Sequence, residues 1–319
     1  MKPTPSVPRW RLLATLLVAA ATLVLAACAP TGAQAVRVVS ANKRVHPQVS
    51  THASVTVTGD VSYGTADGTP LLLDVCSPTA KPGDTTPRAA VLSIHGGSWR
   101  QGDKSSTAWR SVCQWLASEG FVAFSVNYRL APQHPFPAGP DDVRAAVRWM
   151  REPANAYRYG IDPDRIGVFG GSAGGNLAAL LGAEGSGNLT SGSRVAAVAE
   201  LSGPVDLTSA GLRLGTPAPD FQKIELEYLG CPAFDACPQA KEASPLYQVD
   251  ASDPPFFIGN SLNERIPVQQ SEAMVQALRA HGIDTTFVTV KGSAHSIAML
   301  DDSMRSRISA FLHAKLDAL

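Results

Sequence analysis

The chain has 319 residues, of which 27 are Lys or Arg and 27 are Asp or Glu, so its formal net charge is zero. A hydrophobic fraction of 45% supplies a substantial core in a chain of this length and excludes a largely disordered or fibrous protein. Nucleic acid is bound by clustered Lys and Arg, and the sequence has no basic stripe. Composition therefore predicts one large globular domain, or two by length alone, and no nucleic-acid partner.

The first 27 residues have the layout of an export signal. Three basic residues precede an apolar run at 12–25 that is too short to cross a bilayer comfortably as a helix. The segment ends in Leu-Ala-Ala-Cys28, which resembles the lipobox of bacterial lipoproteins, in which Cys28 receives a diacylglyceryl group and becomes the first mature residue. The alternatives are an ordinary signal peptide and an N-terminal anchor helix with an incidental cysteine.

Export changes how the rest of the chain is interpreted. Residues 28–52 show no sustained hydrophobic period, which is typical of a flexible tether between a lipid anchor and a domain. Taking the three signal residues from the 27 basic ones leaves 24 against 27 acidic residues, so the mature part is mildly acidic. We therefore expect a lipoprotein held by Cys28 on the extracytoplasmic side of a bacterial membrane.

The remaining cysteines are an even set, and an oxidising compartment favours pairing them. Cys231 and Cys237 are close in the chain and next to prolines, which suits a small closed loop. Cys76 and Cys113 are then the remaining pair, although four cysteines allow three connectivities. A zinc site is the competing interpretation, but the sequence has no Cys-x-x-Cys spacing and no accompanying His pair.

The folded domain is expected at 53–319. Apolar residues alternate at 55–61 and 71–75 around Asp67-Gly68, which predicts an antiparallel hairpin. Further along, strand-type and helix-type runs alternate. Strands that are apolar on both sides and separated by helices predict an α/β fold with a mostly parallel sheet, helices on both faces and the hairpin at one edge. The strand-type runs are 90–94, 121–126, 166–169, 195–201, 256–259 and 286–290, and the helix-type runs are 108–118, 141–150, 176–183, 268–280 and 303–316.

One long connection between two expected strands, residues 202–247, has no clear period and is rich in Gly and Pro. Long connections of this kind commonly form lids or binding loops. We therefore expect an insertion over the site, and nothing else in the sequence marks a second domain.

The candidate nucleophile is Ser172. Gly170-Gly-Ser172-Ala-Gly174 fits the pattern G-x-S-x-G between a strand-type and a helix-type run. Its glycines permit the sharp strand-to-helix turn that exposes the serine hydroxyl, and the helix N-terminus directs backbone N–H groups at developing negative charge. The alternatives are a Gly-rich turn and a phosphate loop, but a Walker-type loop requires Lys after its last Gly, where Asn176 stands here.

A second turn supplies candidate oxyanion donors. His95-Gly96-Gly97 follows an earlier strand-type run, and glycines there let backbone amides approach a substrate oxygen. Together with the amide of Ala173, which follows the nucleophile, the amides of Gly96 and Gly97 are expected to form an oxyanion hole.

These motifs resemble, in order and spacing, the hormone-sensitive-lipase-like group of α/β-hydrolases, which includes bacterial carboxylesterases and acetyl or feruloyl esterases. Two further segments carry the likeness, Asn-Tyr-Arg-Leu-Ala-Pro at 127–132 and Asp-Pro-Asp-Arg-Ile at 162–166, and it extends over about 55–316. The resemblance implies the α/β-hydrolase fold, a triad in the chain order Ser, acid, His, and neither a metal nor an organic cofactor.

The resemblance places the histidine at His295, in a loop after the last strand-type run, where it would take the proton of Ser172. The acid belongs in the loop 260–267, but many relatives have Asp where this chain has Asn263. We therefore predict Glu264, whose extra methylene compensates for the shifted position. The alternatives are a weakened triad with Asn263 in place, and an acid from elsewhere, although Asp301 and Asp302 break the expected order.

The sequence thus predicts a serine carboxylic-ester hydrolase that acts on short to medium acyl esters, either small molecules or lipid-like esters. Related acyl hydrolases are the alternatives within enzymes: a lipase, a polysaccharide esterase, an amidase or a peptidase. An alternative of another class is a surface-displayed binding lipoprotein that keeps the fold and has weak or no catalysis. Asn263 motivates this alternative, because it cannot hold the negative charge that Asp has at that position in many relatives.

Overall fold

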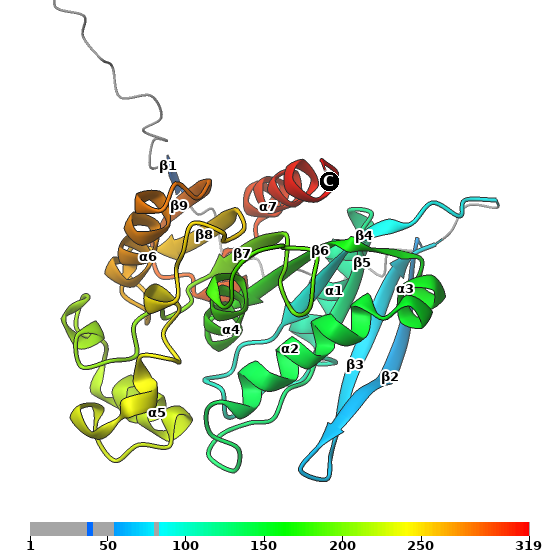
Figure 1. Ribbon diagram of the computed structural model, residues 1–319. Helices are drawn as coiled ribbons and strands as arrows, with labels where there is room; N and C mark the ends of the chain where they lie inside the picture. Colours follow the sequence, from blue (N-terminus) through cyan, green and yellow to red (C-terminus); the bar gives the residue numbers. More distant parts are fainter. Residues whose placement is uncertain (1–36, 41–53, 80–82, 319) are drawn as a thin grey trace, which may run out of the picture. The chain divides into compact units, whose positions relative to one another are not determined.

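The computed structural model describes residues 37–40, 54–79 and 83–318, and within these residues it contains a nine-stranded sheet with the strand order β1-β9-β8-β7-β6-β4-β5-β3-β2 (Figure 1). The expected signal, Cys28 and most of the expected tether lie outside the described residues. The strands are β1 (Arg37–Ser40), β2 (Val55–Ala66), β3 (Thr69–Pro78), β4 (Arg88–Ile94), β5 (Val122–Val126), β6 (Ile161–Gly171), β7 (Ala197–Leu201), β8 (Phe256–Ser261) and β9 (Thr285–Lys291).

The pairing of the strands confirms the predicted sheet. β2 pairs with β3 and β3 with β5 in antiparallel fashion, and every other pair of neighbours is parallel. All residues of β5 and β7 are buried, because helices cover both faces of a parallel sheet. β2 and β3 are joined at Asp67-Gly68, the turn that the sequence indicates.

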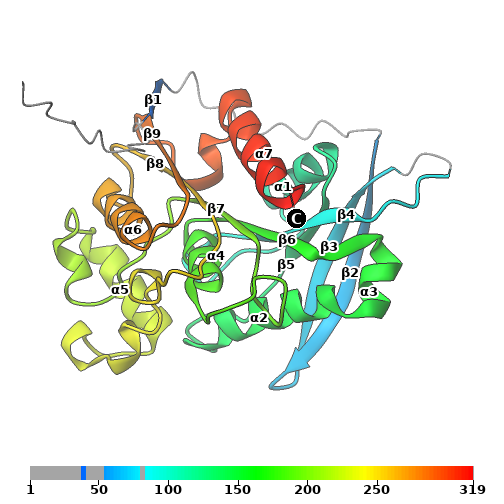
Figure 2. The same cartoon turned by 45° about the horizontal axis from the view of Figure 1, so that its top comes forward.

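Helices form a layer on each face of the sheet (Figure 2). α2, α4 and α6 contribute buried residues to one hydrophobic cluster, and α1 and α7 contribute to a second cluster on the other face. The α-helices are α1 (Thr107–Ser118), α2 (Ala138–Arg151), α3 (Pro153–Tyr159), α4 (Ala173–Ala183), α5 (Pro219–Leu229), α6 (Val268–Ala280) and α7 (Asp302–Leu316), and short 3₁₀ turns are η1 (Gly211–Arg213), η2 (Phe234–Ala236), η3 (Pro238–Ala240), η4 (Pro245–Tyr247) and η5 (Ser296–Met299).

Two features depart from the sequence expectations. β1 lies within the stretch expected to be a tether without regular structure, and it pairs in parallel with the edge strand β9. An open sheet edge offers unpaired N–H and C=O groups, so a segment can add to it without a strong pattern of its own. The insertion 202–247 is also not featureless, because it contains α5 and the turns η1 to η4. No helix of the described part of the chain is long and apolar enough to cross a bilayer.

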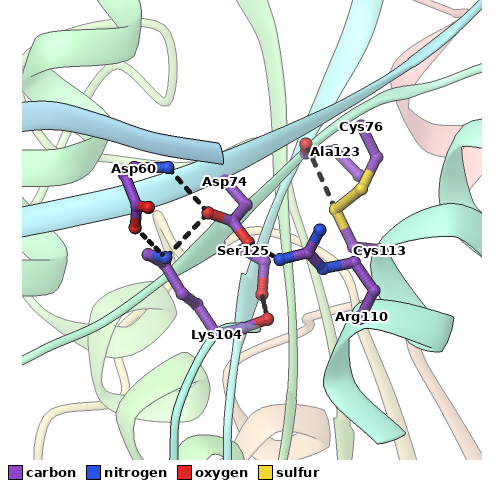
Figure 3. Close-up of a disulfide and its surroundings, with 8 residues drawn as sticks. All are labelled: Asp60, Asp74, Cys76, Lys104, Arg110, Cys113, Ala123 and Ser125. Atoms are coloured by element: carbon purple, nitrogen blue, oxygen red, sulfur yellow. Dashed lines mark hydrogen bonds and ion pairs between the residues drawn. A yellow bond between two sulfur atoms is a disulfide. The ribbon is translucent and has the colours of Figure 1, made fainter. Parts of the chain in front are cut away.

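β3 and α1 are cross-linked twice at the antiparallel edge (Figure 3). Cys76 on β3 forms a disulfide with Cys113 on α1. Two residues earlier on the strand, Asp74 accepts a hydrogen bond from the guanidinium of Arg110, one helical turn before Cys113, at 2.5 Å. The strand and the helix are therefore joined by one covalent bond and one ion pair side by side.

The same carboxylate anchors the loop that leads into α1 (Figure 3). The ammonium of Lys104 is almost fully buried and lies 2.7 Å from Asp74 and 2.8 Å from Asp60. The backbone N–H of Lys104 donates to the side chain of Asn127 at 2.6 Å, and its carbonyl accepts from the hydroxyl of Ser125 at 3.1 Å. This loop begins at the turn His95-Gly96-Gly97, which follows β4 and is called the Gly-rich turn below. The contacts of Lys104 therefore hold that turn in position.

The second disulfide joins Cys231 to Cys237 directly after α5. It closes a short loop, since only six positions separate the two cysteines in the sequence. The connectivity favoured by the sequence is therefore the one in the structure.

Candidate active site

Ser172 lies between β6 and α4, at the edge of the sheet where the parallel strands end. Its backbone has the left-handed value φ = 57°, and its N–H donates to the carbonyl of Leu201 on the neighbouring strand at 2.8 Å. The turn requires glycine because a Cβ on Gly170 would lie 2.0 Å from the carbonyl oxygen of Gly174. This tight turn presents the partly exposed hydroxyl above the sheet.

His295 lies in the loop after β9, and its Nε2 is 2.9 Å from the hydroxyl oxygen of Ser172. Its other ring nitrogen, Nδ1, contacts the carboxylate of Glu264 in the loop after β8. The structure thus brings together three side chains from three separate loops in the order serine, histidine, carboxylate. A carboxylate in this place orients the imidazole and stabilises its protonated form.

The loop after β8 turns Glu264, and not Asn263, toward the histidine. The Glu264 side chain is completely buried, and its Oε1 accepts hydrogen bonds from the Ser202 hydroxyl at 2.7 Å and from the Ser261 N–H at 2.9 Å. Asn263 is exposed, and its backbone N–H donates to the carbonyl of Gly292 at 3.0 Å. The hydrogen bonds from Ser202 and Ser261 stabilise the carboxylate of Glu264 where it is buried away from water.

Ser202 is a site residue that the sequence analysis did not single out. Besides donating to Glu264, its hydroxyl oxygen accepts a hydrogen bond from the N–H of Ser296 at 2.9 Å, directly after the histidine. Ser202 also has a left-handed backbone, with φ = 58°. One hydroxyl therefore connects the loop of Glu264 with the loop of His295, and no local sequence pattern indicates this, because its partners are 62 and 94 positions away in the sequence.

The turn after β4 places Gly96 and Gly97 in the wall of the same pocket as Ser172. Gly97 has φ = 128°, and a Cβ there would lie 1.9 Å from the carbonyl oxygen of Gln101, so no other residue fits. Ala173 is the first residue of α4, where a backbone N–H has no partner within its helix. The three residues expected to supply the oxyanion donors therefore lie next to Ser172.

His95 supports this turn from below. It is buried, its ring stacks on Tyr128 with centroids 4.5 Å apart, and its Nδ1–H donates to the carbonyl of Gly96 at 2.8 Å. The Tyr128 hydroxyl donates in turn to the carbonyl of His95 at 3.0 Å. Burial lowers the pKa of His95, so the ring is held neutral and acts as a structural donor.

A second buried carboxyl group, that of Glu200, lies close to Glu264. Glu200, on β7, is completely buried, and its Oε2 accepts from the N–H of Gly203 at 2.7 Å. Among the described residues, its Oε1 has no hydrogen-bond partner. Burial raises the pKa of Glu200 to about 8, and the nearby charge of Glu264 adds to the effect. Glu200 is therefore neutral at pH 7, while Glu264 has the donors that a charged carboxylate requires.

Ser172 and His295 open into a pocket of about 830 Å³. The Gly-rich turn forms one part of its wall, and α5 of the insertion forms another. Trp109 of α1 lines the pocket, but Trp99 does not: it is buried and stacks on Tyr228 at 4.3 Å between centroids. Asp220, Lys223, Ile224 and Glu227 of α5 line it as well, while the aromatic residues Phe221 and Tyr228 of that helix are buried.

The described residues contain no cluster of three or more His, Cys, Asp or Glu side chains that could hold a metal ion.

The chain matches one protein family and is similar to known esterases. The BD-FAE family pattern matches residues 73–278, which is more than half of the chain. The chain belongs to the BD-FAE family. Among curated relatives of this BD-FAE protein, esterase LipQ of Mycobacterium tuberculosis is 32% identical over 263 residues, which is 79% of this chain and 60% of LipQ. The chain thus spans about three fifths of the length of that relative.

Solved structures show the same architecture. A truncated carbohydrate esterase from gut microbiota superposes with a TM-score of 0.68 at 25% identity, over 82% of this chain and 96% of that one. Thermogutta terrifontis esterase 2, in a form phosphonylated by sarin, also gives a TM-score of 0.68 at 25% identity, over 82% and 95% of the two chains. The BD-FAE protein therefore has the α/β-hydrolase fold that the sequence predicts.

Proposed function

We propose that this protein is a serine carboxylic-ester hydrolase for short to medium acyl esters. The observation that carries the proposal is the continuous contact from Ser172 through His295 to the buried carboxylate of Glu264, in a pocket that Gly96 and Gly97 also line. The esterase relatives and structural neighbours support the same class of reaction.

Acylation uses each group once. The Ser172 oxygen attacks the ester carbonyl carbon while its proton moves to Nε2 of His295, and the C=O electron pair moves to the oxygen, which faces the amides of Gly96, Gly97 and Ala173. Glu264 stabilises the imidazolium that forms. The C–O bond to the alcohol then breaks, the histidine returns its proton to the departing oxygen, and an acyl-serine remains.

Deacylation repeats these steps with water. His295 takes a proton from the water, the hydroxide oxygen attacks the acyl carbon, and the oxyanion is again held by the backbone amides. Collapse of this intermediate releases the carboxylic acid and returns the proton to Ser172. No cofactor enters the balance, since water is the only co-reactant.

The test is turnover of p-nitrophenyl acetate and butyrate together with labelling by a fluorophosphonate probe. We expect the wild type to do both, and Ser172→Ala to lose the probe label and about 10³-fold or more of kcat. The phosphonylated form of Thermogutta esterase 2 supports this choice of probe. A wild type that neither turns over the esters nor takes the probe would overturn the proposal.

The identity of the acid is tested by a matched pair of variants. Glu264→Gln keeps the shape of the side chain but removes the charge, and we expect a loss of about 10²- to 10⁴-fold in kcat. Asn263→Ala removes an exposed side chain and should retain most activity. The reverse result would assign the role to Asn263 and a weakened triad, whereas a wild type that takes no probe would favour the alternative of a binding lipoprotein.

We propose further that the protein is exported and held at the membrane by a lipid on Cys28. The lipobox-like sequence and two disulfides, which persist in oxidising compartments, support this localisation. In a bacterial host, Cys28→Ala should move the protein from the membrane fraction to the soluble exported fraction. Membrane retention of that variant would contradict lipidation at Cys28.

A further inference from the structure

The pocket around Ser172 has five charged residues in its wall apart from His295: Arg100, Asp220, Lys223, Glu227 and Arg265. Three of them belong to α5 at positions three and four apart, which places them on one face of the helix. Three cations and two carboxylates give this wall a formal charge of +1. A substrate bound at Ser172 therefore lies against a wall with a net positive charge.

Both carboxylates on this face are already neutralised. The guanidinium of Arg100, in the loop after the Gly-rich turn, lies 2.9 Å from Glu227. The guanidinium of Arg265, next to the proposed catalytic Glu264, lies 2.5 Å from Asp220. Each ion pair ties α5 to one of the loops that carry the proposed catalytic groups, so α5 is fixed on both sides of the pocket.

Lys223 lies between these two ion pairs in the sequence of α5 and differs from both. Its side chain is exposed, and it forms no ion pair with any residue in the described ranges. It is therefore the one charged residue of this wall whose charge is left for a ligand. A lysine ammonium is a compact charge on a flexible stem, so it can reach an anion without a fixed geometry.

We propose that Lys223 is a specificity-determining residue and that the preferred substrates are esters with an anionic group, such as a carboxylate, near the ester bond. The inference rests on the proposed esterase activity and names its substrate class. Lys223 lines the same pocket as Ser172 and His295, and its flexible stem lets the ammonium pair with an anion on the ester while the carbonyl is at Ser172. Exposed ion pairs of this kind change binding by about twofold to fivefold.

Two pairs of substrates test the preference and locate the anion. In 4-acetoxybenzoate and 4-acetoxybenzamide, the carboxylate or its neutral amide is on the alcohol side of the ester. In the 4-nitrophenyl monoesters of glutaric acid and of its monoamide, the same two groups are on the acyl side. For each pair we measure the ratio of kcat/KM for the anionic ester to kcat/KM for the neutral one. A ratio taken within one enzyme preparation is independent of the fraction of folded protein.

We expect Lys223→Gln to lower the ratio by about twofold to fivefold for at least one pair, and Lys223→Glu to lower it further. The effect should appear mainly in KM. The wild-type ratio should also decrease when the salt concentration is raised from about 0.02 M to about 0.5 M, because salt screens exposed charges. Lys315→Gln is the control, since it removes the same charge from α7 outside the pocket and should keep the wild-type ratios.

The pair that responds shows whether the anion belongs to the alcohol or to the acyl part. Turnover of the four esters with ratios that neither Lys223 variant changes would overturn this inference and leave the esterase activity intact. A wild type that hydrolyses p-nitrophenyl acetate but none of these four esters would overturn this inference alone. A wild type that hydrolyses neither set and takes no fluorophosphonate probe would overturn the proposed function, and this inference with it.

Discussion

Glu200 is a completely buried carboxyl group, and replacing it with Gln should change how the stability of the protein depends on pH. Burial, with the charge of Glu264 nearby, raises the pKa of Glu200 from 4.5 to about 8. One oxygen accepts from the N–H of Gly203, and the other has no partner among the described residues. The folded protein therefore keeps a proton on this group that the unfolded chain releases near pH 4.5.

The magnitude follows from proton linkage. Between pH 4.5 and 8 the folded state binds one proton more than the unfolded state, so the free energy of unfolding falls as the pH rises. The slope is about 1.4 kcal/mol per pH unit, which amounts to on the order of 5 kcal/mol across the window. This contribution is fully present below pH 4.5 and fully lost above about pH 8, and Glu200→Gln removes it.

The assay is urea unfolding of the wild type and Glu200→Gln, with disulfides intact, at several pH values from about 5 to about 9. The difference in unfolding free energy should shift in favour of the variant by about 1.4 kcal/mol per pH unit and level off above about pH 8. A constant cost of burying the Gln amide changes the offset and leaves this slope intact. Glu242→Gln, which removes an exposed carboxyl, should differ from the wild type by less than about 0.5 kcal/mol. A difference between Glu200→Gln and the wild type that does not vary with pH would refute the reasoning.

Three further variants address the turn after β4, the loop of Glu264 and the disulfide between β3 and α1. Gly97→Ala should lower kcat by about 10²-fold or more, because its Cβ would collide with the carbonyl of Gln101 and displace an oxyanion donor; unchanged steady-state kinetics would contradict this. Ser202→Ala leaves a buried N–H without an acceptor and should lower the unfolding free energy by about 1–3 kcal/mol in urea titrations, together with kcat; an effect on neither would remove Ser202 from the site. Replacing Cys76 and Cys113 together by Ala should lower the melting temperature more than loss of the disulfide after α5, because chain entropy gives about 4 kcal/mol for the longer loop and about 2 kcal/mol for the shorter one; the opposite order in calorimetry would rule out this account.

Much of the fold could be predicted from the sequence, because its signals are local. Apolar runs of strand and helix type alternate through 90–316, and the turn at Asp67-Gly68 separates two alternating strands. The region of α5 could not be predicted in this way. Its helix has buried residues on one side and pocket-lining charges on another, within an insertion rich in Gly and Pro. β1 escaped prediction because backbone pairing to an open edge needs no side-chain pattern.

In the candidate site, too, some features follow from the local sequence and others follow only from tertiary contacts. The sequence by itself determined the nucleophile turn at Ser172 and the Gly-rich turn at Gly96, since both need small residues at fixed offsets within a few positions. Only the tertiary structure decided three features of the site. Ser202 joins the loop of Glu264 to the loop of His295, Glu200 is buried close to Glu264, and Lys223 lines the pocket without an ion pair to any described residue. These properties depend on which distant segments meet when the sheet forms, because hydrogen-bond partners, desolvation and ion pairing are set by neighbours in space.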